Sequence, residues 1–479
     1  MGNLKLYNTR TRSIEAFRPL RGNDVRMYVC GLTPSARAHL GHARSFLFFD
    51  LLRRYLMHSG YDVTYVQNVT DIDDRSIERS RQTGENWHDI VMGYYNEFKT
   101  SMRALGVMDP DVEPYATKYI PEIQQMIRTL ISRNLAYRSQ DGVYYRVAAF
   151  PEYGRLSNRN VEELESGARI EIDEHKENPL DFALWKLAKH GEPNWPFDGY
   201  GDGRPGWHIE CSAMSHALLD PDSMGFDIHG GGADLIFPHH ENEIAQSEPL
   251  MDHPPMSNFW IHGGLLNFDG RKMSKSLGNF EPLSDLLARH DPQAVRLAFL
   301  TTGYSKVMNF TDESPASAWS TYERLKKTYR SLASFTPAIP PRELQTLLPK
   351  IEAALDEDMN TSVALAELLQ WQVVENAHGA AEFERALWLL GLKPDDSWLH
   401  ERQTELPADS LQRLQTEFGA EIAFNGATPQ DAIGMVLALR AAARGRKDFA
   451  ASDRLRDALA RCGIAIKDSK EGTSWSVAG

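Results

Sequence analysis

The apolar and polar positions of residues 25–66 describe a strand, a helix and a second strand. Residues 25–30 are apolar and β-rich, large apolar residues recur at helical spacing over 45–58, and 61–66 mixes Tyr, Val and Thr. Short apolar runs predict strands, whereas apolar residues three to four positions apart predict a helix. A strand–helix–strand unit of this kind joins parallel strands by a right-handed crossover. The pattern therefore predicts a doubly wound parallel sheet of the α/β class.

The following residues extend this sheet after a long interruption. Residues 86–134 look helical, and residues 140–206 are irregular and rich in Gly, Pro and Trp. Apolar runs at 226–229 and 259–263 predict later strands, and the amphipathic stretch 239–250 predicts a helix between them. We therefore expect residues 140–206 to form an insertion between two halves of the sheet domain.

Strand patterns fade after about residue 311. Residues 315–397 carry helical periodicity with few glycines, and the final segment 431–479 contains two helical stretches followed by short β-rich runs. Those runs lie at 464–466 and 474–477. The expected fold is an α/β, Rossmann-like doubly wound parallel sheet with an insertion, followed by a helical bundle and a small C-terminal α+β module.

Composition and charge narrow the function classes. The chain is 42% hydrophobic and 25% charged, which is ordinary for a globular protein, and no apolar run is long enough to span a bilayer. The net charge of −14 argues against a general nucleic-acid binder, although residues 440–461 carry seven Lys/Arg and three Asp. In isolation, such a segment is more often a solvated helix face. The three cysteines of the chain make a disulfide scaffold implausible, so we expect a cytoplasmic protein with thiols free to bind metal.

Two short motifs carry candidate chemistry. His-Leu-Gly-His occupies 39–42, directly after the first strand, and Lys-Met-Ser-Lys-Ser occupies 272–276 in a polar loop. Gly41 allows close backbone approach to a ligand, and a helix that starts near Ala43 would point its N-terminus at phosphate oxygens. The pair resembles the HIGH and KMSKS motifs of class I aminoacyl-tRNA synthetases. This resemblance implies that the two motifs bind the triphosphate of ATP from two sides. The resemblance assigns catalysis to His39, His42, Lys272 and Lys275.

A second set of residues has the composition of a zinc site. Cys30 ends the first strand, Cys211 lies in a segment that we expect to lead back into the sheet, and His239 and Glu243 are four apart on one helix face. Two thiolates, an imidazole and a carboxylate suit Zn²⁺. Spacing alone leaves the alternative open, because a lone buried cysteine is usually a small hydrophobic residue and no CxxC is present.

Longer strings of the sequence extend the resemblance. The chain resembles the cysteinyl-tRNA synthetase family over nearly its whole length. The strings that carry it, beside those around the zinc candidates, are Asn-Val-Thr-Asp-Ile-Asp-Asp at 68–74, Asn-Pro-Leu-Asp-Phe-Ala-Leu-Trp-Lys at 178–186, Phe-Asp-Ile-His-Gly-Gly-Gly-Ala-Asp at 226–234, Asp-Glu-Asp-Met-Asn-Thr at 356–361 and Lys-Asp-Phe-Ala-Ala-Ser-Asp at 447–453.

The resemblance implies an activity and its cofactors. A member of this family uses ATP to convert L-cysteine to cysteinyl-adenylate and transfers the cysteinyl group to the 3′ end of tRNA(Cys). One Zn²⁺ per chain, held at positions matching Cys30, Cys211, His239 and Glu243, would select the cysteine thiolate, and Mg²⁺ would accompany ATP. Zinc separates sulfur from oxygen directly, which an apolar pocket does poorly.

The resemblance also implies roles for other residues. ATP would contact His39, His42, Gly231, Asp234 and Lys275. The amino-acid substrate would contact Gly31, Thr70 and Trp207. The anticodon would be read by Arg444, Phe449, Asp453 and Asp468, where Phe449 offers an aromatic face for stacking on a base.

The implied organisation has three parts. Residues 1–310 would form the catalytic domain, with an insertion at about 110–205 and the KMSKS region at about 264–310. Residues 311–400 would form the helical bundle, and residues 401–479 a linker with the anticodon-binding module. We expect a monomer whose partners are ATP, L-cysteine and tRNA(Cys), without a membrane.

One departure keeps alternatives open. Where many family members have Val-Tyr-Asp, this chain has Pro34-Ser35-Ala36. A Thr-Pro start is similar to a related ligase of the mycothiol pathway, which joins activated cysteine to an amino-sugar. That ligase needs no basic anticodon module, and this chain has one. A second alternative is a synthetase-like protein that binds RNA or a partner without catalysis; the intact motifs and all four zinc candidates weigh against it.

Overall fold

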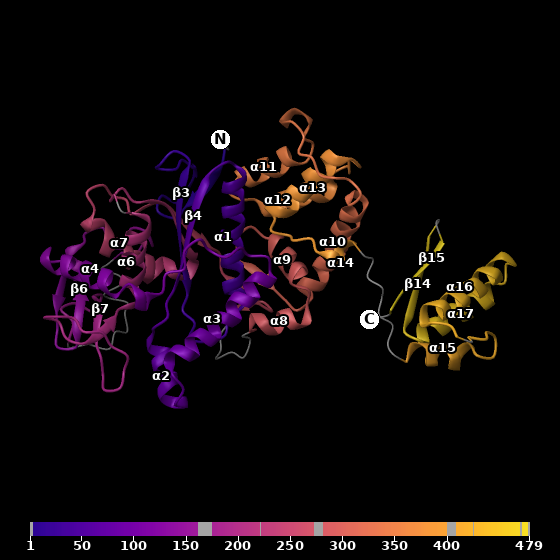
Figure 1. The fold of residues 1–479 in the computed structure, drawn as a ribbon, viewed down its shortest axis with the longest axis horizontal. Coiled ribbons are helices and arrows are strands. Elements are labelled where there is room, and N and C mark those ends of the chain that lie inside the picture. The colour runs from indigo at the N-terminus through magenta and orange to yellow at the C-terminus, as the bar shows by residue number, and fades with distance from the viewer. Residues whose placement is uncertain are drawn as a thin grey trace. The chain divides into compact units, whose positions relative to one another are not determined.

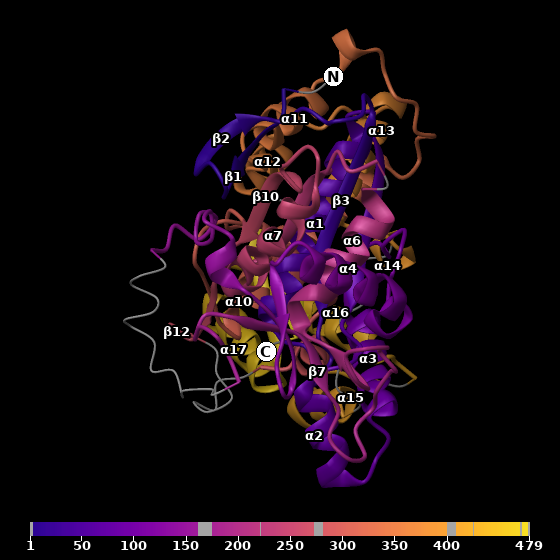
Figure 2. The ribbon, with the colours of Figure 1, turned by 90° about the vertical axis from the view of Figure 1, so that its left-hand side faces the viewer.

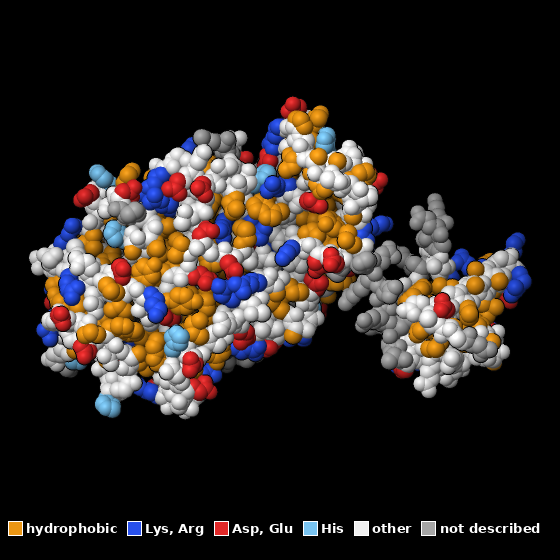
Figure 3. Space-filling view, in the orientation of Figure 1, with side chains coloured by type: hydrophobic (Ala, Val, Ile, Leu, Met, Phe, Trp, Pro, Cys, Tyr) orange, Lys and Arg blue, Asp and Glu red, His pale blue; other side chains and the backbone are white. Residues whose placement is uncertain are grey.

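The computed structural model divides the chain into two compact units, Met1–Asp395 and Asp396–Gly479, and each is described here by itself (Figure 1). The structure describes residues 3–160, 175–220, 222–272, 281–399, 409–424, 426–469 and 472–477. No helix among these residues has the length and apolar character needed to cross a membrane. On the face of the first unit drawn in Figure 3, acidic and basic side chains are interspersed.

The first unit is built on a four-stranded parallel sheet with the order β10-β9-β3-β4. Its strands are β3 (Asp24–Leu32), β4 (Asp62–Val69), β9 (Phe226–Gly232) and β10 (Ser257–Gly263). Helix α1 (Leu40–His58) joins β3 to β4. In Figure 1 the sheet lies between α1 on one side and α6 and α7 on the other. The doubly wound parallel sheet expected from the apolar pattern is confirmed.

The insertion is more ordered than the sequence indicated. We expected residues 140–206 to be irregular, but they supply three strands of a four-stranded antiparallel sheet with the order β5-β6-β7-β8. These strands are β5 (Ala136–Arg138), β6 (Gly142–Tyr145), β7 (Phe182–Leu187) and β8 (Gly203–Pro205). Buried Tyr145 and Trp185 pack in one core with Ile123 and Ile127 of α4 (Ile120–Ser132). The strands are short and separated by Gly- and Pro-containing turns, which hides their period.

Two helical expectations need correction. The stretch 86–134 is not one continuous helical region: α2 (Asp74–Thr83) and α3 (Trp87–Ala104) precede a non-α segment that contains a 3₁₀ turn, Ala116–Lys118, before α4 begins. The segment around Cys211, expected to lead back into the sheet, is helix α6 (Trp207–Leu219). Most of the helix is buried, and its buried residues include polar Glu210, Ser212 and Ser215 beside apolar ones, so no amphipathic stripe marks it.

The helical stretch that we expected at 239–250 is present as consecutive helical turns. The segment Ile236–His240, which is kinked by a non-helical backbone at Phe237, leads into α7 (Glu241–Ser247) and a 3₁₀ turn at Glu248–Leu250. In Figure 2 the bundle helices α11 to α13 lie at the top of the view.

The rest of the first unit comprises two small sheets, β1-β2 and β12-β11-β13, and a set of helices. The strands are β1 (Lys5–Asn8), β2 (Ser13–Ala16), β11 (Leu266–Phe268), β12 (Arg271–Lys272) and β13 (Met308–Phe310). The helices are α8 (Leu283–Arg289), α9 (Pro292–Leu300), α10 (Glu313–Leu332), α11 (Leu348–Asp356), α12 (Thr361–Gln370) and α13 (Ala377–Leu389).

The second unit has the α+β composition that the sequence predicted. It contains α14 (Asp396–Leu399), α15 (Ser410–Phe418), α16 (Pro429–Gly445), α17 (Phe449–Arg461), β14 (Ile464–Ser469) and β15 (Gly472–Val477). The last two strands pair antiparallel. Its core is formed by buried Leu414, Phe418, Ile433, Val436, Leu455 and Leu459.

Candidate functional site

The candidate site lies at the carboxyl ends of the parallel strands. Strand β3 is central, and the chain leaves it toward β4 on one side while β9 and β10 lie on the other. In doubly wound sheets, ligands bind at this point, where the strand order reverses. Cys30 lies near the end of β3, and Gly230 and Gly231 lie near the end of β9.

The two zinc-candidate cysteines meet although 181 positions separate them in the sequence. Cys30 Sγ from β3 lies 3.7 Å from Cys211 Sγ from α6. Both cysteines are free thiols and both are buried. Two sulfur atoms bound to one tetrahedral Zn²⁺ at about 2.3 Å lie roughly 3.8 Å apart, so the observed separation fits a shared metal.

His239 and Glu243 complete this set from the opposite side. His239 Nε2 lies 3.2 Å from Glu243 Oε1, one helical turn apart, and Cys30 Sγ lies 3.5 Å from the same oxygen. The four candidate ligand atoms all lie within 4.8 Å of one another, and all four residues are buried. The structure thus brings together the four residues named from the sequence, and their donor set fits Zn²⁺; the metal itself stays a prediction.

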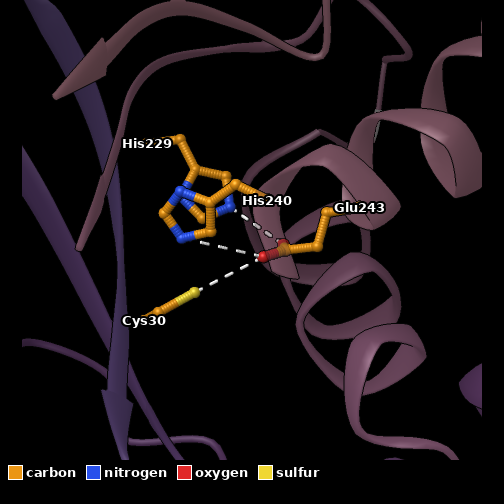
Figure 4. A group of neighbouring side chains, drawn as sticks. All are labelled: Cys30, His229, His240 and Glu243. Carbon is orange, nitrogen blue, oxygen red and sulfur yellow. Dashed lines mark hydrogen bonds and ion pairs between the residues drawn. The ribbon is translucent and has the colours of Figure 1, made fainter. Parts of the chain in front are cut away.

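A second group, which sequence reasoning missed, shares two members with the first. Cys30, His229, His240 and Glu243 also place their donor atoms within 4.8 Å of one another. Figure 4 shows Cys30 approaching from the strand side and Glu243 from the helix side, with the two imidazoles between. His229 Nε2 lies 2.9 Å from Glu243 Oε2. The first set has the softer donors, and His229 is placed to orient Glu243 from behind.

A chain of histidines extends from this group. His240 Nδ1 contacts His262 Nε2 at 2.8 Å, and His262 Nδ1 contacts Thr9 Oγ1 at 2.7 Å. On the other side, His208 Nδ1 lies 3.0 Å from His239 Nδ1. His229 stands inside the string at 226–234 and His240 follows His239, but only the fold shows that these rings converge.

The electrostatics of this cluster favour a cation. Burial, followed by the neighbouring Cys211, raises the pKa of the Cys30 thiol well above its ordinary value. Burial lowers the pKa of His239 and of His240 well below the ordinary value. The imidazoles are therefore neutral and offer lone pairs, whereas the thiols need a nearby positive charge to ionise. A divalent metal would supply that charge.

Trp207 lies against the cluster as the sequence-based reading requires. It is the first residue of α6, and its ring centroid lies 4.3 Å from that of His239 with an interplanar angle of 35°. Its side chain remains 41% exposed. An indole that touches a candidate ligand on one face and solvent on the other can form the wall of a small pocket.

The His-Leu-Gly-His motif forms the N-terminus of α1, which begins at Leu40 rather than near Ala43. His39 Nδ1 accepts a hydrogen bond from Gly41 N–H at 3.1 Å, and His42 Nδ1 accepts one from His39 N–H at 3.2 Å. The two rings stack with centroids 3.8 Å apart. Burial, followed by His39, lowers the pKa of His42 to about 3. Both imidazoles thus cap the helix as neutral rings, with their Nε2 atoms on the far side from the capping contacts.

Gly31 lies in β3 and Thr70 directly follows the neighbouring strand β4. A Cβ at Gly31 would lie 1.6 Å from the carbonyl oxygen of Asn68, so only glycine fits there. Gly31 N–H donates to Asn68 Oδ1 at 2.8 Å, and Asn68 Nδ2 donates to Thr70 Oγ1 at 3.2 Å. Glu210, which sequence reasoning also missed, is buried nearby, and burial followed by Asp71 raises its pKa well above the ordinary value.

Gly231 and Asp234 lie at the end of β9. A Cβ at Gly231 would lie 2.8 Å from Leu235 Cδ1 and 3.0 Å from the His240 ring, so its absence keeps the strand end close to the histidines. Asp234 is exposed in the turn that follows. These positions are compatible with contact to a ligand above the strand ends, and the contact itself is a prediction.

The lysine motif is only partly described. Lys272 ends β12, where it pairs with Asn267 of β11. Lys275 lies outside the described residues. The role of both lysines stays a prediction.

In the second unit, the expected anticodon-contacting residues gather on α16, α17 and β14. Asp468 accepts from Arg440 Nη2 at 2.8 Å and from Arg444 Nη1 at 2.9 Å. Phe449, the first residue of α17, is 63% exposed, and Asp453 contacts Arg456 at 3.4 Å. An exposed phenylalanine close in sequence to arginines offers a stacking face with cations near it.

Comparison with known families matches both units. Residues 16–320 match the family model described as the class I (C) tRNA synthetase catalytic domain, and residues 430–475 match the model described as the cysteinyl-tRNA ligase anticodon binding domain.

Curated relatives span the chain. A cysteine–tRNA ligase of Methylococcus capsulatus is 45% identical over 476 residues, covering 98% of this chain and 99% of the relative. A cysteine–tRNA ligase of Azotobacter vinelandii is 43% identical over 475 residues, covering 98% of this chain and 99% of the relative.

Solved structures agree on the fold. A methionyl-tRNA synthetase of Mycobacterium tuberculosis with methionyl-adenylate is 15% identical, with a TM-score of 0.55 over 77% of this chain and 89% of that one. A LeuRS–tRNA–LeuAMS complex of Agrobacterium radiobacter is 13% identical, with a TM-score of 0.57 over 78% of this chain and 84% of that one. At these identities the likeness concerns the fold alone.

Proposed function

Because the chain belongs to the cysteine–tRNA ligase family of class I aminoacyl-tRNA synthetases, we propose that it forms cysteinyl-adenylate from L-cysteine and ATP and transfers the cysteinyl group to the 3′ end of tRNA(Cys). The observation that carries the proposal is the convergence of Cys30, Cys211, His239 and Glu243 at the carboxyl ends of the sheet. That set would select the substrate by its sulfur.

The metal set explains how a small thiol would be recognised. Cys30, Cys211, His239 and Glu243 would hold one Zn²⁺, which supplies, when bound, a soft Lewis acid that prefers a thiolate to a hydroxyl. His229 would fix the orientation of Glu243 through their 2.9 Å contact. The ring of Trp207 would close the side of the pocket beside His239. Gly31 and Thr70 would place the amino-acid backbone at the carboxyl ends of the paired strands β3 and β4.

The first step would depend on position and charge rather than on a proton transfer. An oxygen of the cysteine carboxylate attacks the α-phosphorus of ATP, the bond from that phosphorus to the bridging oxygen breaks, and pyrophosphate leaves with the electron pair. His39 and His42 at the start of α1 would line the phosphate side, with Lys272, Lys275 and Mg²⁺ offsetting the developing negative charge. Gly231 and Asp234 would border the nucleoside.

In the second step a ribose hydroxyl of the terminal adenosine attacks the carbonyl carbon of the adenylate, and AMP leaves. The second unit would hold the distant end of the same tRNA. Arg444, Phe449, Asp453 and Asp468 would contact the anticodon, and the excess of Lys/Arg over Asp at 440–461 would attract its phosphates. A local basic segment therefore reconciles the net charge of −14 with an RNA substrate.

The organisation into a catalytic domain over 1–310, a helical bundle over 311–400 and a linker with an anticodon-binding module over 401–479 is part of the proposal. We also propose that the protein acts as a monomer in the cytoplasm. Free thiols at Cys30 and Cys211 need a reducing compartment to stay available for metal.

The two alternatives raised by the sequence have less support. The mycothiol-pathway ligase would explain Thr33-Pro34, but an anticodon-binding family model matches 430–475, and cysteine–tRNA ligases match this chain over 98% of its length. A binding protein without catalysis would not need four buried donor atoms converging beside Trp207.

The experiment that tests the proposal is ATP–pyrophosphate exchange by the purified full chain with each of the twenty amino acids in turn. We expect exchange with cysteine alone, followed by charging of tRNA(Cys). Exchange that requires a different amino acid, or exchange with cysteine but transfer only to an amino-sugar, would contradict it.

A further inference from the structure

Arg44, two residues after the His-Leu-Gly-His motif, makes an unusual set of contacts. Its side chain is 6% exposed. Its Nη1 lies 3.2 Å from the carbonyl oxygen of Gly264 and 2.7 Å from that of Leu265. Its Nη2 lies within 3.4 Å of the carbonyl oxygens of Gly303, Tyr304 and Lys306.

From these contacts, and resting on the proposed function, we propose that Arg44 is a positioning residue for adenylate formation. It fixes the segments 264–265 and 303–306 against helix α1. Because α1 begins with the expected ATP-contacting histidines, and β11 and β12 lead from Leu266 to Lys272, Arg44 fixes the start of the lysine motif, Lys272, relative to those histidines.

The guanidinium has no acidic partner in the described part of the chain: no carboxylate there lies within the 4.0 Å of an ion pair. Its charge is instead balanced by five carbonyl dipoles, and burial lowers its pKa to about 10. A planar group with forked donors can hold two backbone segments at once, whereas a lysine presents a single point charge. The arginine side chain at position 44 can therefore bond to both backbone segments at the same time.

The segments that Arg44 holds are packed too closely to move independently. A Cβ on Gly264 would lie 2.4 Å from the carbonyl oxygen of Lys306, so only glycine fits between them. Gly264 N–H donates to the carbonyl of Tyr304 at 2.7 Å. Phe48, one helical turn after Arg44, stacks on the Tyr304 ring with centroids 3.8 Å apart. Helix α1 thus contacts the segments 264–265 and 303–306 through Arg44 and Phe48.

A second arginine, Arg37, helps to hold the segment that follows the lysine motif in the sequence. Arg37 donates to both carboxylate oxygens of Asp285, at 2.9 and 2.6 Å, and Leu283 N–H donates to the carbonyl of Ala38 at 2.9 Å. The Arg37 and Asp285 side chains are 38% and 46% exposed, so this pair is weak by itself. Arg44, being buried, carries the inference.

This geometry separates positioning from direct catalysis. The Nη1 and Nη2 atoms of Arg44 donate to five backbone carbonyls of its own chain, so these donors are already used before any phosphate binds. Loss of Arg44 should therefore misplace the phosphate-contacting groups without touching the pocket built around Cys30 and Trp207. Displacements of about 1 Å from remote substitutions can slow a reaction by roughly a hundredfold.

The test measures steady-state ATP–pyrophosphate exchange by the full chain with Arg44→Lys and Arg44→Ala. We expect kcat to fall roughly a hundredfold for Arg44→Ala and less for Arg44→Lys, while KM for cysteine stays within about threefold of wild type. Arg296→Lys is the control, because Arg296 is also buried and donates to the carbonyls of Leu390 and Leu105, in addition to its ion pair with Asp50. It should lower the melting temperature without this kcat effect.

Two further measurements keep the proposal testable if Arg44→Ala is poorly folded. Gly264→Ala pushes against the Lys306 carbonyl from the opposite side and should give the same fall in kcat with an unchanged KM for cysteine. Millimolar guanidinium should restore part of the exchange activity of Arg44→Ala, whose cavity matches it, and should not restore Gly264→Ala.

Wild-type kcat per folded molecule in Arg44→Ala, or in Gly264→Ala if the former does not fold, would overturn the positioning role. So would a fall in kcat that comes with an equal change in KM for cysteine, because a positioning role predicts that only kcat changes. Absence of cysteine-dependent exchange in the wild-type chain would instead defeat the proposed function, so the two failures are distinguishable.

Discussion

Cys30 Sγ and Cys211 Sγ lie 3.7 Å apart, one on a central strand of the sheet and the other on a helix that follows the insertion. A disulfide needs about 2.05 Å between the sulfurs, whereas two thiolates on one tetrahedral zinc need roughly 3.8 Å. The fold therefore places these thiols as metal ligands would be placed. The proposed selection of cysteine by its sulfur would depend on this relationship.

Cys211→Ser should abolish stoichiometric zinc. Serine oxygen is a poor replacement for a thiolate, and the remaining three donors form an incomplete set. Elemental analysis of the purified protein should give one zinc per wild-type chain and a large loss in the variant. Cys462→Ser is the matched control, because Cys462 is a buried free thiol of the second unit. Wild-type protein that is fully active with substoichiometric zinc would contradict this expectation.

His229→Ala should weaken zinc binding although His229 is not one of the four proposed zinc ligands. Its Nε2 contact of 2.9 Å with Glu243 holds the carboxylate in place, and loss of such a partner typically costs about 10- to 100-fold in metal affinity. Competition with a chromogenic chelator measures the change. His216→Ala, at an exposed position on α6, serves as the control. Equal affinities in His229→Ala and wild type would show that Glu243 needs no such support.

Stability of the metal-free protein should fall as the pH drops below about 6.5. Burial, followed by the neighbouring His229, lowers the pKa of His262 to about 3. Between the unfolded pKa near 6.5 and the folded pKa, the unfolded chain binds the extra proton, so acidification favours unfolding by about 1.4 kcal/mol per pH unit for this group. His262→Gln should flatten the decline seen in urea unfolding between these two pH values. Superimposable pH profiles would contradict the assignment.

Phe449→Ala should weaken tRNA binding while leaving pyrophosphate exchange intact. The ring is 63% exposed at the start of α17, and loss of a base-stacking aromatic typically costs about 1–3 kcal/mol. Filter binding of tRNA(Cys), repeated at rising salt, measures the effect. Met435→Ala, at an exposed apolar position on α16, is the matched control. An equal loss in both variants would point to a nonspecific surface effect.

Lys275→Ala should slow adenylate formation much more than it weakens cysteine binding. Its charge is expected to act on the redistributing phosphate charge, and loss of one such contact costs about 2.7–4 kcal/mol, or roughly a hundred- to a thousandfold in rate. Pre-steady-state ATP consumption measures this directly, with Lys350→Ala as a surface control. A rate within about threefold of wild type would refute the role.

The sequence predicted those parts of the fold in which apolar residues form clear runs or recur at a regular helical spacing. The unit β3–α1–β4 and the strands β9 and β10 follow from apolar runs and helical spacing. The strands of the insertion were missed because they are three to six residues long and end in Gly or Pro turns. Helix α6 was missed because a buried helix carries no polar face.

The candidate site was predictable only in part for a related reason. Cys30, Cys211, His239 and Glu243 have metal-ligating chemistry that is visible in the sequence. The supporting contacts of His229, His262 and Arg44 are made across strands and helices that are far apart in the chain. Arg44 in particular bonds to backbone carbonyls, which leave no trace in residue types.

The most direct test of the central claim is aminoacylation of tRNA(Cys) by the purified zinc-loaded chain with cysteine or serine as the amino acid. We predict efficient formation of cysteinyl-tRNA and a kcat/KM for serine lower by about 10⁴ or more, the discrimination expected when a site binds a group that the competitor lacks. Comparable charging with serine, or no charging with cysteine by folded protein that holds its zinc, would contradict selection of the substrate by its sulfur.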